Sequence, residues 1–198
     1  MRKLAFSVTV ITILALSFST HYKADDDSSG GQGEQSKGVT ARALLTGYQE
    51  VPAVSSQGIG QFDAKLSDDK TKINFKLEWK NLEGTSITNA DLRFGQFSVT
   101  GGVVALLCGT GAPIATCGDP ASGSIEGSIL ATDIKGPQAQ GIDPTETTVL
   151  DEVLRAMVNG NTYVNIHTDK FPDGEIRGQA LFRRIGLFRN SDQAPKKD

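Results

Sequence analysis

The side chains that could do chemistry are few beyond residue 38. His167 is the only histidine in that part of the sequence, and Cys108 and Cys117 are the only cysteines. A catalytic metal site commonly takes about three protein ligands, often including several histidines, and this set does not supply them. The sequence also lacks a G-x-S-x-G segment, a phosphate-binding loop and a dinucleotide-binding glycine pattern. It therefore predicts no catalytic residues, no metal and no cofactor, although carboxylates that pair only in space would escape such a search.

The densest group of polar side chains lies near the end of the chain and forms a candidate polar binding strip: Tyr163, Asn165, His167, Glu175, Arg177 and Gln179. The first three alternate along one expected strand and the last three along the next, so the two rows can lie side by side. The strip is either a binding surface or a hydrogen-bonded hairpin that fixes strand register. We favour the hairpin because the spacing is that of cross-strand neighbours. We expect Val164 and Ile166 to face the core while His167, Glu175 and Arg177 form a polar row outside.

The two cysteines predict a structural disulfide. Cys108 and Cys117 lie in a segment with flanking Gly and Pro, which is typical of a loop. A redox-active or metal-binding pair would favour the closer C-x-x-C spacing and further ligands nearby.

The beginning of the chain resembles a secretory leader. A positive start is followed by a short apolar run to Phe18, and a cut after Ser19 places small side chains at both recognition positions. A cut after Ala24, or an uncleaved anchor, are the alternatives. The expected organisation is a signal peptide over 1–19, a polar spacer over 20–38, one domain over 39–184 and a polar tail over 185–198. This organisation predicts a secreted or periplasmic protein with no membrane span once the leader is removed.

The sequence predicts an all-β domain with one helix. Short alternating segments separated by turns predict a β-sandwich or barrel, with strands at 40–46, 59–66, 73–79, 88–96, 102–107, 124–131, 162–168 and 175–182. Asp143-Pro144 predicts a helix start, an apolar stripe over 149–158 continues it, and Gly160 ends it. The net charge of -3 gives no basic surface for nucleic acid.

Two motifs resemble the CHRD domain, named for chordin. The first is the closing segment Gly-Asn-Thr-Tyr-Val-Asn-Ile-His-Thr-Asp-Lys-Phe-Pro-Asp-Gly-Glu-Ile-Arg-Gly-Gln over 160–179. The second is the opening Ala-Leu-Leu-Thr-Gly-Tyr-Gln-Glu-Val-Pro over 43–52. The resemblance covers about 40–183 and implies an immunoglobulin-like β-sandwich, here with one short helix before the last β-hairpin. It also implies an extracellular context like that of chordin, which binds growth factors.

One place departs from the family pattern. Many members carry a His-Ile-His-x-Gly signature in a central strand, where this chain has Asp91 and Arg93. Residues two apart share one strand face, and we expect an exposed ion pair that contributes little to stability.

Two functions from different classes remain. The first is a non-catalytic exported module that binds an extracellular or envelope protein or glycan. The second is an extracellular hydrolase or a degenerate dismutase-like enzyme on the same fold, and the missing histidines argue against the dismutase version.

Overall fold

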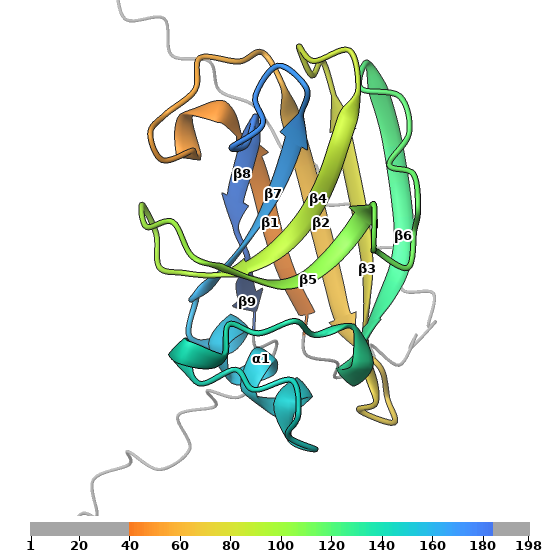
Figure 1. Cartoon of the computed structure of the whole chain (residues 1–198), viewed down its shortest axis with the longest axis vertical. Coiled ribbons are helices and arrows are strands. Elements are labelled where there is room, and N and C mark those ends of the chain that lie inside the picture. Colours follow the sequence, from red (N-terminus) through yellow and green to blue (C-terminus); the bar gives the residue numbers. More distant parts are fainter. Residues whose placement is uncertain (1–39, 184–198) are drawn as a thin grey trace, which may run out of the picture. The chain divides into compact units, whose positions relative to one another are not determined.

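The computed structural model describes residues 40–183. The expected leader, spacer and tail lie outside the described residues. Nine strands are present in the described part: β1 Thr40–Thr46, β2 Ile59–Leu66, β3 Lys72–Lys80, β4 Ile87–Phe94, β5 Gly102–Gly109, β6 Ser122–Leu130, β7 Thr162–Thr168, β8 Ile176–Gln179 and β9 Leu181–Arg183. One α-helix, α1 Val149–Val158, precedes β7 (Figure 1). The all-β class, with one short helix before the closing hairpin, is confirmed.

The strands form one continuous antiparallel sheet. Its order is β5-β4-β7-β8-β1-β2-β3-β6, with β9 paired to β1. The sheet curls so that β4, β5 and β7 cross in front of β1, β2 and β3 (Figure 1). An isolated bridge between Ala105 and Ile134 ties β5 to the segment that follows β6, so the sheet nearly closes on itself. This path differs from the separate sheets of an immunoglobulin-like sandwich, and that detail of the prediction is not confirmed.

The hydrophobic core fills the inside of the curled sheet, because apolar residues alternate with more polar ones along the strands. Along β3, Ile73, Phe75, Leu77 and Trp79 are buried while the residues between them are more exposed. Each apolar side chain removed from water contributes roughly 1.5–3 kcal/mol, which makes this inner layer the main source of stability.

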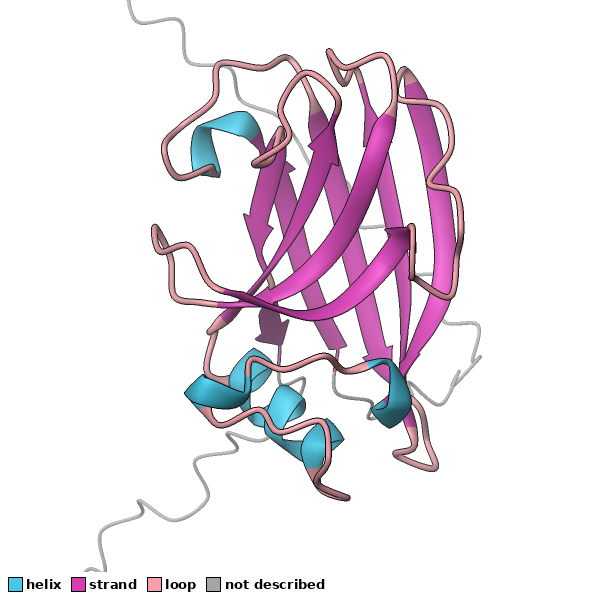
Figure 2. Cartoon of the chain, viewed as in Figure 1, coloured by secondary structure: helices cyan, strands magenta, loops and turns pink. Residues whose placement is uncertain are grey.

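The helix covers one end of the sheet, where Figure 2 also shows short helical turns. It begins at Val149, later than the predicted start, because Asp143 caps a separate turn by accepting the Thr145 N–H at 2.9 Å. It ends as predicted, since Gly160 adopts a positive φ of 69°.

The predicted disulfide between Cys108 and Cys117 is present. It closes the loop after β5, and both cysteines are buried in the core cluster. Among residues 40–183, no helix is long and apolar enough to cross a membrane.

Candidate functional site

Strand β7 is buried on both of its faces. One face packs into the core, and the other, called the second face below, holds the candidate site. Val164 and Ile166 face the core, whereas Tyr163, Asn165 and His167 point to the other side and are equally buried. Glu175 and Arg177 are buried as well, so the expectation that His167, Glu175 and Arg177 form an outer row is wrong. The loops that follow β1 and β4, and the turn between β7 and β8, supply the other walls.

Neighbouring strands bring further charged residues onto this second face. Asp91 lies opposite Asn165 in the register of β4 and β7, and Arg93 lies opposite Tyr163. Asn165 in turn lies opposite Arg177 on β8. Because opposite residues of paired strands share a face, the sheet register itself gathers these side chains.

Asp91 is the buried centre of an ion-pair network. Arg93 donates to it from Nε at 2.8 Å and from Nη2 at 3.1 Å, and the Asn89 amide donates at 3.1 Å. His167 Nε2 lies 3.3 Å from Asp91 Oδ2. Burial opposes ionisation, but His167 and Arg93 outweigh it and hold the pKa of Asp91 below its usual value. Asp91 is 0% exposed, so the expectation of an exposed surface pair is wrong.

His167 is held in one orientation from both sides of its ring. Its Nδ1 lies 2.9 Å from the Pro172 carbonyl oxygen, and because a carbonyl only accepts, Nδ1 carries a proton. Its Nε2 faces the Asp91 carboxylate but has no aligned hydrogen-bond partner in the described part of the chain.

Arg177 lies flat against the ring of Tyr163. The guanidinium carbon is 3.6 Å from the ring centroid, a cation–π stack. Arg177 Nη2 donates to the Gln96 carbonyl at 3.2 Å, and the Tyr163 hydroxyl accepts the Gly101 N–H at 2.9 Å. The loop after β4 is thereby tied to β7 and β8.

Glu50 enters this face from the loop after β1. It is 8% exposed, and its Oε1 has no hydrogen-bond partner among residues 40–183. Burial raises the pKa of Glu50 to about 7, although His167, Arg177 and Arg93 attract the ionised form. The carboxyl of Glu50 therefore exchanges its proton near neutral pH.

These groups surround a pocket of about 250 Å³. Its lining comes from the loops named above and from β4, β7 and β8: Glu50, Val51, Pro52, Arg93, Thr100, Tyr163, Asn165, His167, Pro172, Asp173 and Arg177. The unpartnered buried atoms Glu50 Oε1 and Asn165 Oδ1 belong to side chains of this lining. Since buried polar groups normally find partners, these atoms mark a place where a ligand can supply them.

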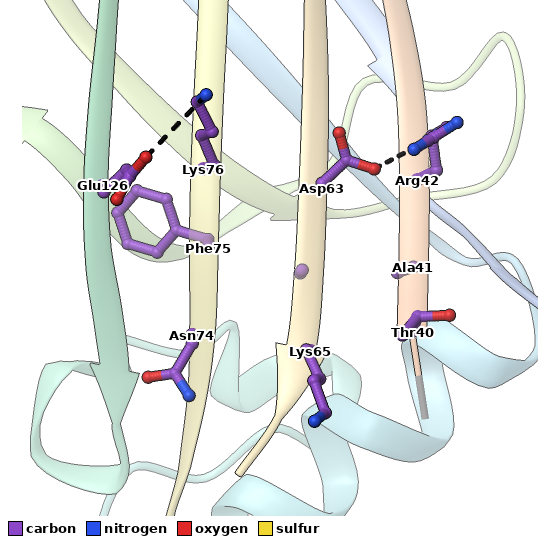
Figure 3. A pocket seen from close by; sticks show the side chains of 10 residues that line it. Thr40, Ala41, Arg42, Asp63, Lys65, Asn74, Phe75, Lys76 and Glu126 are labelled. Carbon is purple, nitrogen blue, oxygen red and sulfur yellow. Dashed lines mark hydrogen bonds and ion pairs between the residues drawn. The ribbon is translucent and has the colours of Figure 1, made fainter. Parts of the chain in front are cut away.

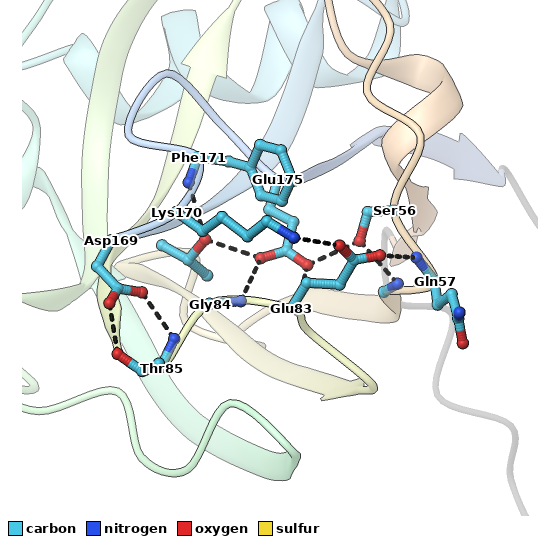
Figure 4. A network of polar contacts seen from close by, with 11 residues as sticks. Ser56, Gln57, Glu83, Gly84, Thr85, Asp169, Lys170, Phe171 and Glu175 are labelled. Carbon is cyan, nitrogen blue, oxygen red and sulfur yellow. Dashed lines mark hydrogen bonds and ion pairs between the residues drawn. The ribbon is translucent and has the colours of Figure 1, made fainter.

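Glu175 does not join this pocket. Its carboxylate accepts hydrogen bonds from Ser56 Oγ at 2.7 Å, from the Glu83 N–H at 2.6 Å and from Thr168 Oγ1 at 2.7 Å (Figure 4). The Gly84 N–H is a fourth donor at 3.3 Å. Glu175 thus fastens two loops to the β7–β8 hairpin and has a structural environment.

Gln179 also binds loops and does not line the pocket. Its Nε2 donates to the carbonyls of Gly95 at 2.9 Å and Gly160 at 2.7 Å. Of the six residues in the predicted strip, the pocket therefore unites Tyr163, Asn165, His167 and Arg177.

A larger hollow of about 580 Å³ lies over the β1-β2-β3-β6 part of the sheet (Figure 3). Its charged side chains pair with one another, as Arg42 does with Asp63 at 2.6 Å and Lys76 with Glu126 at 3.8 Å. Exposed pairs of this kind contribute about 0–1 kcal/mol and are typical of a solvated sheet face. The smaller pocket is the better candidate, because most of its polar side chains are buried and Glu50 and Asn165 among them have unpartnered atoms.

Residues that the sequence did not assign to the site prove central to it. Asp91 and Arg93 were placed on one strand face but were expected in solvent, and Glu50 lies in the Glu-Val-Pro segment of the opening motif. Asp91 and Arg93 stand at the signature positions of the family, and Glu50 stands in its opening motif. These positions were the signal that the sequence offered. Within the described residues, no group of three or more His, Cys, Asp or Glu side chains could hold a metal ion.

Fold and site together define an all-β domain with a charged pocket beneath its loops. The family model of the CHRD domain matches residues 41–180, and the chain belongs to this family. CHRD domains are typically non-catalytic binding modules, and they are not a known family of enzymes. No curated protein and no solved structure matches the chain.

Proposed function

We propose that the protein is an exported, non-catalytic binding module that recognises an extracellular or envelope protein or glycan through the Glu50–Arg177 pocket and its bordering loops. The observation that carries this proposal is the pocket itself, in which buried polar atoms of Glu50 and Asn165 lack partners within the described chain. Export is supported by the leader-like start of the sequence and by the disulfide.

The two loops that border the pocket carry exposed apolar side chains. Tyr48 is 72% exposed and Phe97 is 65% exposed, and Val51 and Val99 are also exposed. The loop that bears Tyr48 supplies Val51 to the pocket wall, and the loop that bears Phe97 supplies Thr100. Exposed aromatic side chains around a polar pocket are typical of a recognition surface, since they bury large areas when a partner binds.

Nothing specific favours the hydrolase or dismutase-like alternative. The described contacts of the His167 ring nitrogens are with the Pro172 carbonyl and the Asp91 carboxylate, and neither is a serine or cysteine that the imidazole could activate. A Ser–His or Cys–His pairing of the catalytic type requires the nucleophile within hydrogen-bond reach of the imidazole.

The test is a pull-down with the secreted protein from a cell-surface extract, together with a glycan array. Replacement of both aromatic side chains, Tyr48→Ser with Phe97→Ser, should abolish retention of the partner. Leu130→Ser is the matched control, because Leu130 is an exposed apolar residue at the end of β6, outside the pocket lining. Equal retention by the loop variant and the control would contradict binding through this surface.

A further inference from the structure

We propose that the ligand presents a carboxylate group to this pocket, with Arg177 as its main charged partner. The inference rests on the proposed function, because it names the chemistry that the same pocket would recognise. Three observations carry it: the two guanidinium groups of the pocket lining, the geometry of Arg177, and the buried carboxyl of Glu50, whose Oε1 has no partner among residues 40–183.

Two guanidinium groups face the pocket, Arg93 from β4 and Arg177 from β8. Asp91 lies behind Arg93 and is already committed to it through two hydrogen bonds. The remaining acidic groups are Glu50 and the exposed Asp173 of the β7–β8 turn. A cationic ligand or a metal ion would therefore meet two guanidinium groups at close range, whereas an anion is attracted.

Arg177 is oriented to bind a planar anion. The ring of Tyr163 lies against the guanidinium carbon, and the Gln96 carbonyl accepts from Nη2, so the group is held from two sides. Within residues 40–183 the guanidinium makes no other hydrogen bond. The rigid fork of an arginine matches the two oxygens of a carboxylate, and pre-orientation reduces the entropy lost on binding.

Glu50 and Asn165 complete the lining opposite this charge. A Cβ atom on Gly174 would lie 2.7 Å from Glu50 Oε1 and 2.6 Å from Asn165 Nδ2, so only glycine leaves room for both groups. In its protonated form Glu50 can donate a hydrogen bond to a carboxylate oxygen, and Asn165 can donate from its amide. A pKa of about 7 makes the protonated form accessible near neutral pH.

The lining suits a singly charged group, because Arg177 is its one guanidinium without an ion-pair partner among residues 40–183, whereas Arg93 is paired with Asp91. A carboxylate forms a single hydrogen-bonded pair with protonated Glu50, so its binding is coupled to uptake of one proton. Burial raises the pKa of Glu50 to about 7, and it outweighs the attraction of His167, Arg177 and Arg93 for the ionised form, while Asp91 acts in the same direction as burial.

The experiment is calorimetric or NMR titration of the secreted protein with sodium glucuronate and with glucose, which carry the same ring but differ in the carboxylate. N-acetylglycine, a mimic of a peptide C-terminus, and inorganic phosphate form two further arms. We expect saturable binding of a carboxylate at least ten-fold tighter than that of glucose. Because Glu50 must be protonated in the complex, affinity should rise roughly ten-fold from pH 8 to pH 6. The preferred arm, glucuronate or N-acetylglycine, identifies a sugar acid or a peptide terminus as the source.

Two variants and one control make the test specific. Arg177→Met should weaken carboxylate binding at least ten-fold, while Arg42→Met, which removes an exposed arginine from the outer sheet face, should not. Glu50→Gln should lose the ten-fold pH dependence, which keeps the proposal testable if Arg177→Met does not fold. Equal affinity for glucose, tighter binding of phosphate, or full pH dependence in Glu50→Gln would each overturn the proposal. If no carboxylate binds but partner retention still requires Tyr48 and Phe97, the carboxylate inference fails and the binding function stands.

Discussion

Replacing Glu50 with glutamine should make the protein more stable at pH 8 than the wild type while changing little at pH 5. Glu50 is buried, and burial raises its pKa from 4.5 to about 7. The folded state therefore holds this proton more tightly than the unfolded state. Stability from the neutral carboxyl is fully present below pH 4.5 and is lost as the pH rises through about 7.

The size of the effect follows from the shift in pKa. One unit corresponds to about 1.4 kcal/mol, so between pH 5 and pH 8 the wild type should lose about 2–3 kcal/mol that Glu50→Gln retains. Partial access of solvent to the pocket makes this an upper value. Other titrating groups act equally on both proteins, so the difference between them isolates Glu50.

The assay is urea unfolding of both proteins at pH 5, 6, 7 and 8 at constant ionic strength, with the slope of each transition checked for equality. Glu126→Gln serves as the control, because it removes an exposed carboxylate from β6. If the curves of free energy against pH for Glu50→Gln and wild type run parallel, the carboxyl of Glu50 is not held neutral by burial, and the reasoning is refuted.

Three further predictions concern the frame around the pocket. Glu175→Ala should destabilise the domain by about 3–5 kcal/mol, because it leaves buried donors without an acceptor. Thermal unfolding against the control Glu126→Ala measures this loss, and equal melting temperatures would contradict the loop-fastening role. Replacing Cys108 and Cys117 together with alanine should cost about 2–3 kcal/mol in urea unfolding, as expected for a short closed loop, and an unchanged midpoint would argue against it. N-terminal sequencing of secreted material should begin between residues 20 and 25, and an intact start in a membrane pellet would show that the leader is an anchor.

The positions of the strands could be predicted closely because alternation is a local signal. The sequence predicts strands at 40–46 and 162–168, and β1 and β7 have these bounds. Alternation states which side chains are buried, but it does not state which strands become neighbours. The continuous sheet, in which β7 lies between β4 and β8, depends on long-range pairing that no local pattern encodes.

The candidate site was predictable only in part, for a related reason. Alternation correctly separates Asn165 and His167 from the core-facing Val164 and Ile166. Their burial on the second face depends on loops over 47–58 and 95–101, which come from distant parts of the sequence. Glu175 was expected in the same row as His167, but its carboxylate turns toward Thr168 because the donors of two other loops converge there.

The pair Asp91 and Arg93 bears on the carboxylate binding that we propose. Asp91 lies 3.3 Å from His167, so two histidines at these positions, as in the His-Ile-His-x-Gly signature of many family members, would gather three imidazoles on adjoining strands. Three imidazoles are typical of a transition-metal site. In this chain the carboxylate of Asp91 and the guanidinium of Arg93 neutralise each other there. For the carboxylate ligand that we propose, Arg177 is therefore the guanidinium of the lining that remains free to pair with it.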